Sequence, residues 1–189
     1  YYKEFYWSNR GSHDVSQNVS SHVPSLHNID LSRERIEWIR SYFAEISSVI
    51  DFGAGDCAAA YTFSTEYGIK NVSIFEKSVR SAEIAKTMGM NYYDQVDNAP
   101  MVDLVFSAHS IEHVSDLKSS FQLIVSKVKD GGCIFFETPN IADLETFKAM
   151  PHTPHTYMLS IDSIKQLASA FACELIATDT TGPKWQRAY

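Results

Sequence analysis

Cysteine is scarce in this sequence, and the three cysteines that occur, Cys57, Cys133 and Cys173, lie far apart and form no CxxC pair. The absence of paired cysteines argues against a disulfide framework and against a zinc site built from thiolates. We expect buried, unreactive thiols in a reducing compartment. No signal peptide or lipidation motif is recognisable, so the sequence predicts a cytoplasmic location.

Long hydrophobic runs and blocks of basic residues are also missing. No apolar stretch approaches the roughly 20 residues that a membrane-spanning helix needs. The chain has 16 Lys and Arg residues against 23 Asp and Glu residues, a net charge of −7, and its basic residues form no dense patch. The sequence therefore argues against membrane and nucleic-acid partners. Its 189 residues match a single globular domain with one core.

Segments typical of strands and of helices alternate through most of the chain. Strands are expected at 48–52, 72–75, 91–93, 102–107, 133–138 (after a turn at Gly131-Gly132) and 173–178. Helices are expected at 32–43 (with Ser32 as N-cap), from Ala58 onward, and at 81–88, 117–128 and 160–171. This alternation implies right-handed crossovers and a mainly parallel sheet, and therefore an α/β fold.

Residues 1–30 and 139–158 do not fit this alternation. The first thirty residues open with an aromatic cluster and then become polar, and we expect them to form an N-terminal arm on the domain or a lid over a substrate. Residues 31–189 then form the domain itself. The second stretch is a long loop with three prolines and two histidines after a strand, and such loops are often functional.

A carboxylate precedes a glycine turn at the end of the first expected strand. Glycine tolerates positive φ and lets a ligand approach the backbone closely, so Gly53-Ala54-Gly55 is typical of a nucleotide-cofactor loop. Written as Gly53-x-Gly55-x-x-Ala58, the segment also fits the relaxed dinucleotide fingerprint. Dinucleotide enzymes usually carry an apolar side chain where this sequence has Asp51. The acid favours a cationic ligand instead.

Three segments, in this order and spacing, resemble motifs of the class I S-adenosylmethionine-dependent methyltransferases: Asp51-Phe52-Gly53-Ala54-Gly55, Val102 to Val114, and Lys129 to Asn140. The chain looks closest to the group that includes the ubiquinone-biosynthesis O-methyltransferases and many sugar or natural-product methyltransferases. The resemblance implies a Rossmann-like three-layer sandwich with helices on both faces of the sheet. It also implies a last, antiparallel strand, which is expected to be short or truncated because only residues 185–189 remain for it.

Cys57 departs from the family's pattern, which has a third glycine at this position. A side chain there is expected to narrow the loop without abolishing cofactor binding. Because of this departure, a non-catalytic domain that binds the cofactor, or only a partner, is retained as an alternative.

The resemblance implies contacts with S-adenosylmethionine from several loops. Gly53, Ala54 and Gly55 would bring backbone close to the methionine part of the cofactor. Asp51 would accept a hydrogen bond from its ammonium group, directly or through water, and Glu76 would hold the two ribose hydroxyls. The remaining expected contacts follow other strands, near the adenine for Lys77, Asp94 and Gln95 and near the methionine for Ser107 and Ala108.

The segment His109-Ser110-Ile111-Glu112-His113 supports two interpretations. It matches an inverted zinc-protease motif, but that motif needs a long helix, whereas this segment continues a strand. As part of a methyltransferase, it would open the active-site wall, with His109 as the candidate base. His113 could act likewise or serve a structural role. The resemblance to the quinone-pathway members also allows an accessory divalent metal at Glu112 and His113, although no metal is expected to be required.

A further candidate lies in the late loop, where His155 is expected to contact the substrate or transfer a proton. The predicted reaction is in-line methyl transfer to an oxygen, nitrogen or carbon of a small molecule. The Asn/Asp-Pro-Pro-Tyr/Phe signature of amino-group DNA methylation is absent, and the chain is acidic, which favours a small acceptor. A nicotinamide-dependent reductase of Rossmann type is the other enzymatic alternative. The oligomeric state is not predicted.

Overall fold

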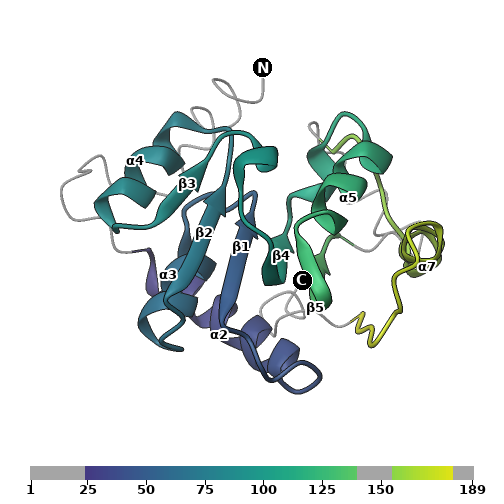
Figure 1. Cartoon of the computed structure of the whole chain (residues 1–189), viewed down its shortest axis with the longest axis horizontal. Helices are drawn as coiled ribbons and strands as arrows, with labels where there is room; N and C mark the ends of the chain where they lie inside the picture. The colour runs from purple at the N-terminus through teal and green to yellow at the C-terminus, as the bar shows by residue number, and fades with distance from the viewer. Residues whose placement is uncertain (1–23, 140–154, 181–189) are drawn as a thin grey trace.

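Five parallel strands form the centre of the molecule, in the order β3-β2-β1-β4-β5 (Figure 1). The computed structural model describes residues 24–139 and 155–180. The strands are β1 (Ser48–Phe52), β2 (Asn71–Phe75), β3 (Asn91–Tyr93), β4 (Val102–Ala108) and β5 (Val128–Glu137). Every neighbouring pair is parallel, which confirms the predicted α/β class.

Helices cover both faces of this sheet, as predicted. They are α2 (Leu26–Arg40), α3 (Ala58–Thr65), α4 (Val79–Thr87), α5 (Leu117–Val125) and α7 (Ile161–Ala170). Two short 3₁₀ helices, η3 (Val96–Asn98) and η4 (Ile111–His113), follow β3 and β4. One buried cluster joins α2, α3 and α4 to the sheet, and a second cluster joins α5 to it. This is the three-layer arrangement of a Rossmann-like fold.

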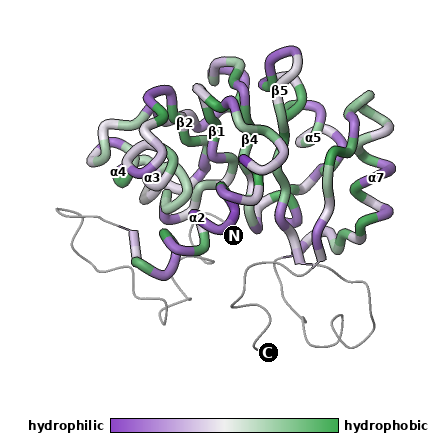
Figure 2. The backbone as a smooth tube through the Cα atoms, turned by 90° about the horizontal axis from the view of Figure 1, so that it is seen from below, coloured by the Kyte–Doolittle hydropathy of each residue, from purple (hydrophilic) through white to green (hydrophobic). Residues whose placement is uncertain are grey.

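The two clusters follow from the alternation of side chains along each strand. Val49 and Leu104 belong to the cluster beneath α2 and α3, whereas Ile50 and Val105 belong to the cluster beneath α5. All residues of β1 are buried because helices cover both of its faces. In Figure 2 the tube of α7 alternates between hydrophilic and hydrophobic colours, as expected of an amphipathic helix. Within the described ranges, no helix is long and apolar enough to cross a membrane.

Helix α2 begins earlier than predicted. Its N-cap is Ser25, whose Oγ accepts a hydrogen bond from the backbone N–H of Asn28 at 3.2 Å. The predicted N-cap, Ser32, lies inside α2 instead, and its Oγ donates to the carbonyl of Asn28 at 2.8 Å. The helix therefore crosses the predicted boundary between arm and domain. Residues 1–23, and with them most of the predicted arm or lid, lie outside the described residues.

The fifth strand also begins earlier than predicted, and α5 ends earlier. Val102 pairs with Val128 and Leu104 with Cys133, so one residue of β4 faces four residues of β5. Gly131-Gly132, predicted as a turn before the strand, lies inside this bulge, where Gly131 has φ +74°. Because of the bulge, Val128 already pairs with Val102 before the regular pairing that begins at Cys133.

The strand predicted at 173–178 is wrong, because no strand is formed there in the part of the chain that the structure describes. Leu175 and Ile176 are exposed. A strand needs a neighbour to satisfy its backbone, and this segment pairs with none of the five described strands. The last strand, predicted at 185–189, falls outside the described residues.

Candidate functional site

The loop after β1 adopts the backbone that its glycines predict. Gly53 has φ +75° and Gly55 has φ +55°, both in the left-handed region. Cys57 also has a positive φ, +63°, and is the left-handed N-cap residue of α3. The position at which the family has a third glycine thus keeps a glycine-like conformation in this chain, although it carries a side chain.

Replacing Cys57 tests this conformation. Its side chain is fully buried, and its burial raises the pKa of the thiol. We expect Cys57→Gly to be at least as stable as Cys57→Ala, because a left-handed conformation costs a residue with a Cβ about 1–2 kcal/mol. At an ordinary buried position glycine would be the less stable of the two by about 0.5–1 kcal/mol. Urea unfolding of both variants measures the difference, and a clearly more stable Cys57→Ala would contradict it.

Asp51 lies near the carboxyl end of β1, the central strand of the sheet. It pairs with Ile74 of β2 and Phe106 of β4. Its side chain is buried, and Oδ2 accepts a hydrogen bond from the backbone N–H of Ala60 at 3.1 Å. Burial raises the pKa of this carboxyl to about 7, against the opposing effect of the Ala60 hydrogen bond. Asp51 is therefore partly protonated at neutral pH.

Glu76 connects the loops that follow β1 and β2. Its side chain is buried, and Oε2 accepts from the backbone N–H of Gly55 at 3.4 Å. Oε1 accepts from the backbone N–H groups of Lys77 at 2.6 Å and Ser78 at 3.1 Å. Its own carbonyl accepts from the hydroxyl of Tyr92. These contacts fix the carboxylate beside the glycine loop, where the ribose-binding acid was predicted.

The other predicted cofactor residues differ in their burial. Ser107 is fully buried near the end of β4, and Ala108, the last residue of that strand, pairs with Glu137 of β5. Lys77 follows the carboxyl end of β2, as Glu76 does, and Asp94 and Gln95 follow the carboxyl end of β3. The side chains of all three residues are exposed. Their roles near an adenine stay predictions.

Two serines near the glycine loop were not predicted. Ser81 donates from Oγ to the carbonyl of Gly55 at 2.7 Å, and Ser110 donates from Oγ to the carbonyl of Gly53 at 3.2 Å. Both contacts join residues that are far apart in sequence. No local motif in the sequence could have indicated them.

His109 follows β4 and is held between two carboxylates. Its Nε2 lies 2.9 Å from Oε1 of Glu137, and its Nδ1 lies 3.6 Å from Oε1 of Glu112. Burial disfavours the charged imidazole, but the two carboxylates outweigh this effect and raise the pKa of His109 to about 9. The imidazole is therefore protonated at neutral pH, which suits a hydrogen-bond donor better than the base predicted from the sequence.

Glu137 links His109 to helix α2. Arg35 of α2 donates to its two oxygens, from Nε at 2.9 Å and from Nη2 at 2.6 Å. Burial alone would raise the pKa of Glu137, but Arg35 and His109 lower it to about 2. The bidentate pair fastens α2 to the carboxyl end of β5. Neither Arg35 nor Glu137 was predicted as a site residue.

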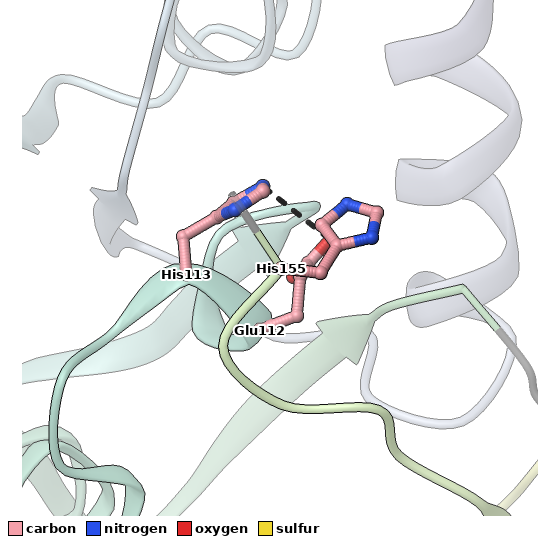
Figure 3. Close-up of side chains that lie close together, drawn as sticks. All are labelled: Glu112, His113 and His155. Atoms are coloured by element: carbon pink, nitrogen blue, oxygen red, sulfur yellow. Dashed lines mark ion pairs between the residues drawn. The ribbon is translucent and has the colours of Figure 1, made fainter. Parts of the chain in front are cut away.

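The other two predicted histidines lie next to each other. The rings of His113 and His155 are 4.8 Å apart between centroids, at an interplanar angle of 41°. Figure 3 shows both imidazoles beside the carboxylate of Glu112. Glu112 Oε1 lies 3.8 Å from Nε2 of His113. The structure thus brings Glu112 and His113 of η4 close to His155, which follows the undescribed part of the late loop.

Comparison with known proteins agrees with the fold. A family model described as a methyltransferase domain matches residues 11–178. The structure resembles the plantazolicin methyltransferase BpumL in complex with a desmethyl-plantazolicin analogue and S-adenosylhomocysteine, with a TM-score of 0.62 and 12% identity; the match covers 79% of this chain and 65% of that chain. That match therefore spans somewhat less than two thirds of the BpumL chain.

Two further solved structures are similar. A SAM-dependent methyltransferase from Archaeoglobus fulgidus has a TM-score of 0.62 and 19% identity, with 84% of this chain and 82% of that chain covered. SAM-bound CalS10, an amino pentose methyltransferase from Micromonospora echinaspora, has a TM-score of 0.51 and 15% identity, with 59% and 50% covered. No curated protein gives a significant sequence match. The family match, which spans most of the chain, establishes that this protein belongs to the methyltransferase-domain family.

Proposed function

We propose that this protein is an S-adenosylmethionine-dependent methyltransferase that acts on a small molecule. One observation carries the proposal: the buried carboxylate of Glu76 lies against the N–H of Gly55 in the positive-φ loop after β1. A carboxylate at the end of β2 beside such a loop is suited to hold a ribose. Relatives named above were solved with S-adenosylhomocysteine or SAM bound, which supports the same ligand for this chain.

The residues at the carboxyl ends of β1 and β2 can contact different parts of the cofactor. S-adenosylmethionine supplies an electrophilic methyl group on a sulfonium sulfur when it is bound. Gly53, Ala54 and Gly55 leave the backbone accessible to the methionine part, Asp51 offers a carboxylate to its ammonium group, and Glu76 offers two oxygens to the ribose. The chain's contribution to transfer is to align the acceptor and to exclude water. A cytoplasmic location, which the three unpaired cysteines favour, belongs to the same proposal.

The proposed role of Asp51 predicts that cofactor affinity depends on pH. Only the ionised carboxylate attracts the ammonium group, and the pKa of Asp51 is raised to about 7. We expect the Kd for S-adenosylhomocysteine to fall about tenfold from pH 6 to pH 8 and to level off above that range. In Asp51→Asn this dependence should disappear, since the amide does not titrate. Isothermal titration calorimetry at several pH values measures both proteins, and an equal pH dependence in both would contradict the role.

A thermal-shift comparison of ligands separates the proposed function from its alternatives. We expect S-adenosylhomocysteine to raise the melting temperature and NADPH to leave it unchanged. Stabilisation by NADPH alone would favour the reductase, and a response to neither ligand would favour a domain without a cofactor. An intact-mass screen of small-molecule acceptors for added methyl groups then tests catalysis and identifies the acceptor class.

A further inference from the structure

We propose that Glu112, His113 and His155 form a binding site for one divalent transition-metal ion, with Zn²⁺ as the best match. Each residue offers one ligand atom, and these atoms all lie within 4.8 Å of one another. In Figure 3 the side chains converge from two segments, Glu112 and His113 from the turn after β4 and His155 from the late loop. The resemblance to quinone-pathway enzymes concerned only the first two residues. His155 is the ligand that the structure adds.

The carboxylate of Glu112 is the strongest indication of a bound cation. Its side chain is 1% exposed, and neither of its oxygens makes a hydrogen bond within the described structure. The nearest imidazole nitrogens are Nδ1 of His109 at 3.6 Å and Nε2 of His113 at 3.8 Å. Burying a carboxylate without hydrogen bonds is costly. A cation held between Glu112 and two imidazoles would bind this carboxylate directly, which neither imidazole does at these distances.

The backbone fixes the two segments relative to each other. The carbonyl of Glu112 accepts from the N–H groups of Thr156 at 2.9 Å and Tyr157 at 3.0 Å, directly after His155. The Tyr157 hydroxyl donates to the carbonyl of Ser115 at 3.2 Å. These contacts anchor the segment after His155 to η4 and to the turn that follows it. His155 is thereby held near Glu112 even without a metal ion, as a preorganised site requires.

The distances are close to those that a zinc site needs. Zinc ligands at about 2.0–2.1 Å from the ion in a tetrahedron lie about 3.3 Å from one another. Glu112 and His113 are already separated by 3.8 Å between Oε1 and Nε2, so small side-chain rotations would close the site. His155 is partly exposed, which gives an ion access from solvent, whereas the side chain of His113 is only 6% exposed. Three protein ligands would leave a fourth position open.

The donor set distinguishes between metals. Mg²⁺ prefers oxygen ligands and retains water, whereas two imidazole nitrogens and one carboxylate oxygen suit Zn²⁺ and similar transition metals. We therefore expect Zn²⁺ to bind and Mg²⁺ not to compete at millimolar concentration. This site goes beyond the proposed methyl transfer, because metal binding does not require S-adenosylmethionine.

Competition with a chromogenic zinc chelator tests the site in metal-stripped, full-length protein. We expect one Zn²⁺ per chain at this site, and at least about 100-fold weaker binding in Glu112→Gln and in His155→Ala. His27→Ala is the matched control, because it removes an exposed histidine of α2 that is not part of the cluster, and it should bind Zn²⁺ like the wild type. Co²⁺ absorption spectra give a second readout, since the d–d bands of bound Co²⁺ should disappear in both variants.

Zinc affinity that is unchanged in Glu112→Gln and His155→Ala would overturn the proposal, and so would preferential binding of Mg²⁺. Circular dichroism establishes whether each variant is folded. Should Glu112→Gln unfold, His155→Ala carries the test alone, because it truncates a partly exposed side chain. Titration with S-adenosylhomocysteine in the same samples is independent of the zinc result, so failure of the metal site is distinguishable from failure of the proposed function.

Discussion

Glu76→Ala is expected to weaken the binding of S-adenosylhomocysteine at least about 100-fold. The carboxylate would hold two ribose hydroxyls, and hydrogen bonds to a charged group contribute roughly 1.5–3 kcal/mol each. Two such bonds correspond to at least about 3 kcal/mol, or a factor of more than 100 in the dissociation constant. Isothermal titration calorimetry of wild type and variant measures this loss.

Two controls separate ribose binding from loop stability. Glu76 also accepts hydrogen bonds from the backbone of Gly55, Lys77 and Ser78, so its removal disturbs the loops themselves. Glu76→Gln retains a carbonyl oxygen and should weaken binding less than Glu76→Ala does. Glu83→Ala removes an exposed acid from α4 and should bind like the wild type. A folded Glu76→Ala that binds S-adenosylhomocysteine with wild-type affinity would refute the ribose assignment.

Gly53→Ala is expected to lower the free energy of unfolding by about 2–5 kcal/mol. A Cβ at this position would lie 1.5 Å from Oγ and 2.5 Å from Cβ of Ser110, so one of the two segments must move. Overpacking of this kind costs about 1–3 kcal/mol. The positive φ of +75° adds the left-handed penalty of about 1–2 kcal/mol. Urea unfolding gives the total.

Gly68→Ala is the matched control for this prediction. Gly68 has nearly the same φ, +68°, but a Cβ there would meet nothing within 4 Å. It should therefore lose only the left-handed penalty of about 1–2 kcal/mol. The double variant Gly53→Ala with Ser110→Gly should recover part of the loss, because it removes the clashing atoms. Equal destabilisation by Gly53→Ala and Gly68→Ala would show that the contact with Ser110 is unimportant.

The order of the elements and the cofactor loop could be predicted because their signals are local. β1, the glycine turn and α3 are continuous in sequence, and Glu76 follows directly after β2. Each of these features needs only a pattern of a few residues. The predicted family and fold are confirmed for this reason.

The charge network of the site could not be predicted, because its partners are distant in sequence. Arg35 and Glu137 are 102 positions apart, and Ser110 and Gly53 are 57 apart. The pKa of His109 depends on the same network, so its protonation at neutral pH could not be inferred from the residue type. The β5 bulge likewise depends on its register with β4. Residues 173–178 have the pattern of a strand, but none of the described strands pairs with them.

Hydrogen–deuterium exchange with and without S-adenosylhomocysteine tests most directly whether the edge formed by the glycine loop and Glu76 is the cofactor site. We expect slower exchange at residues 53–57 and at 76–78 when the ligand is present, because it would cover the backbone of both loops. Residues 66–70, beyond α3, should exchange unchanged. Protection confined to other parts of the chain, or no protection at saturating ligand, would contradict the assignment.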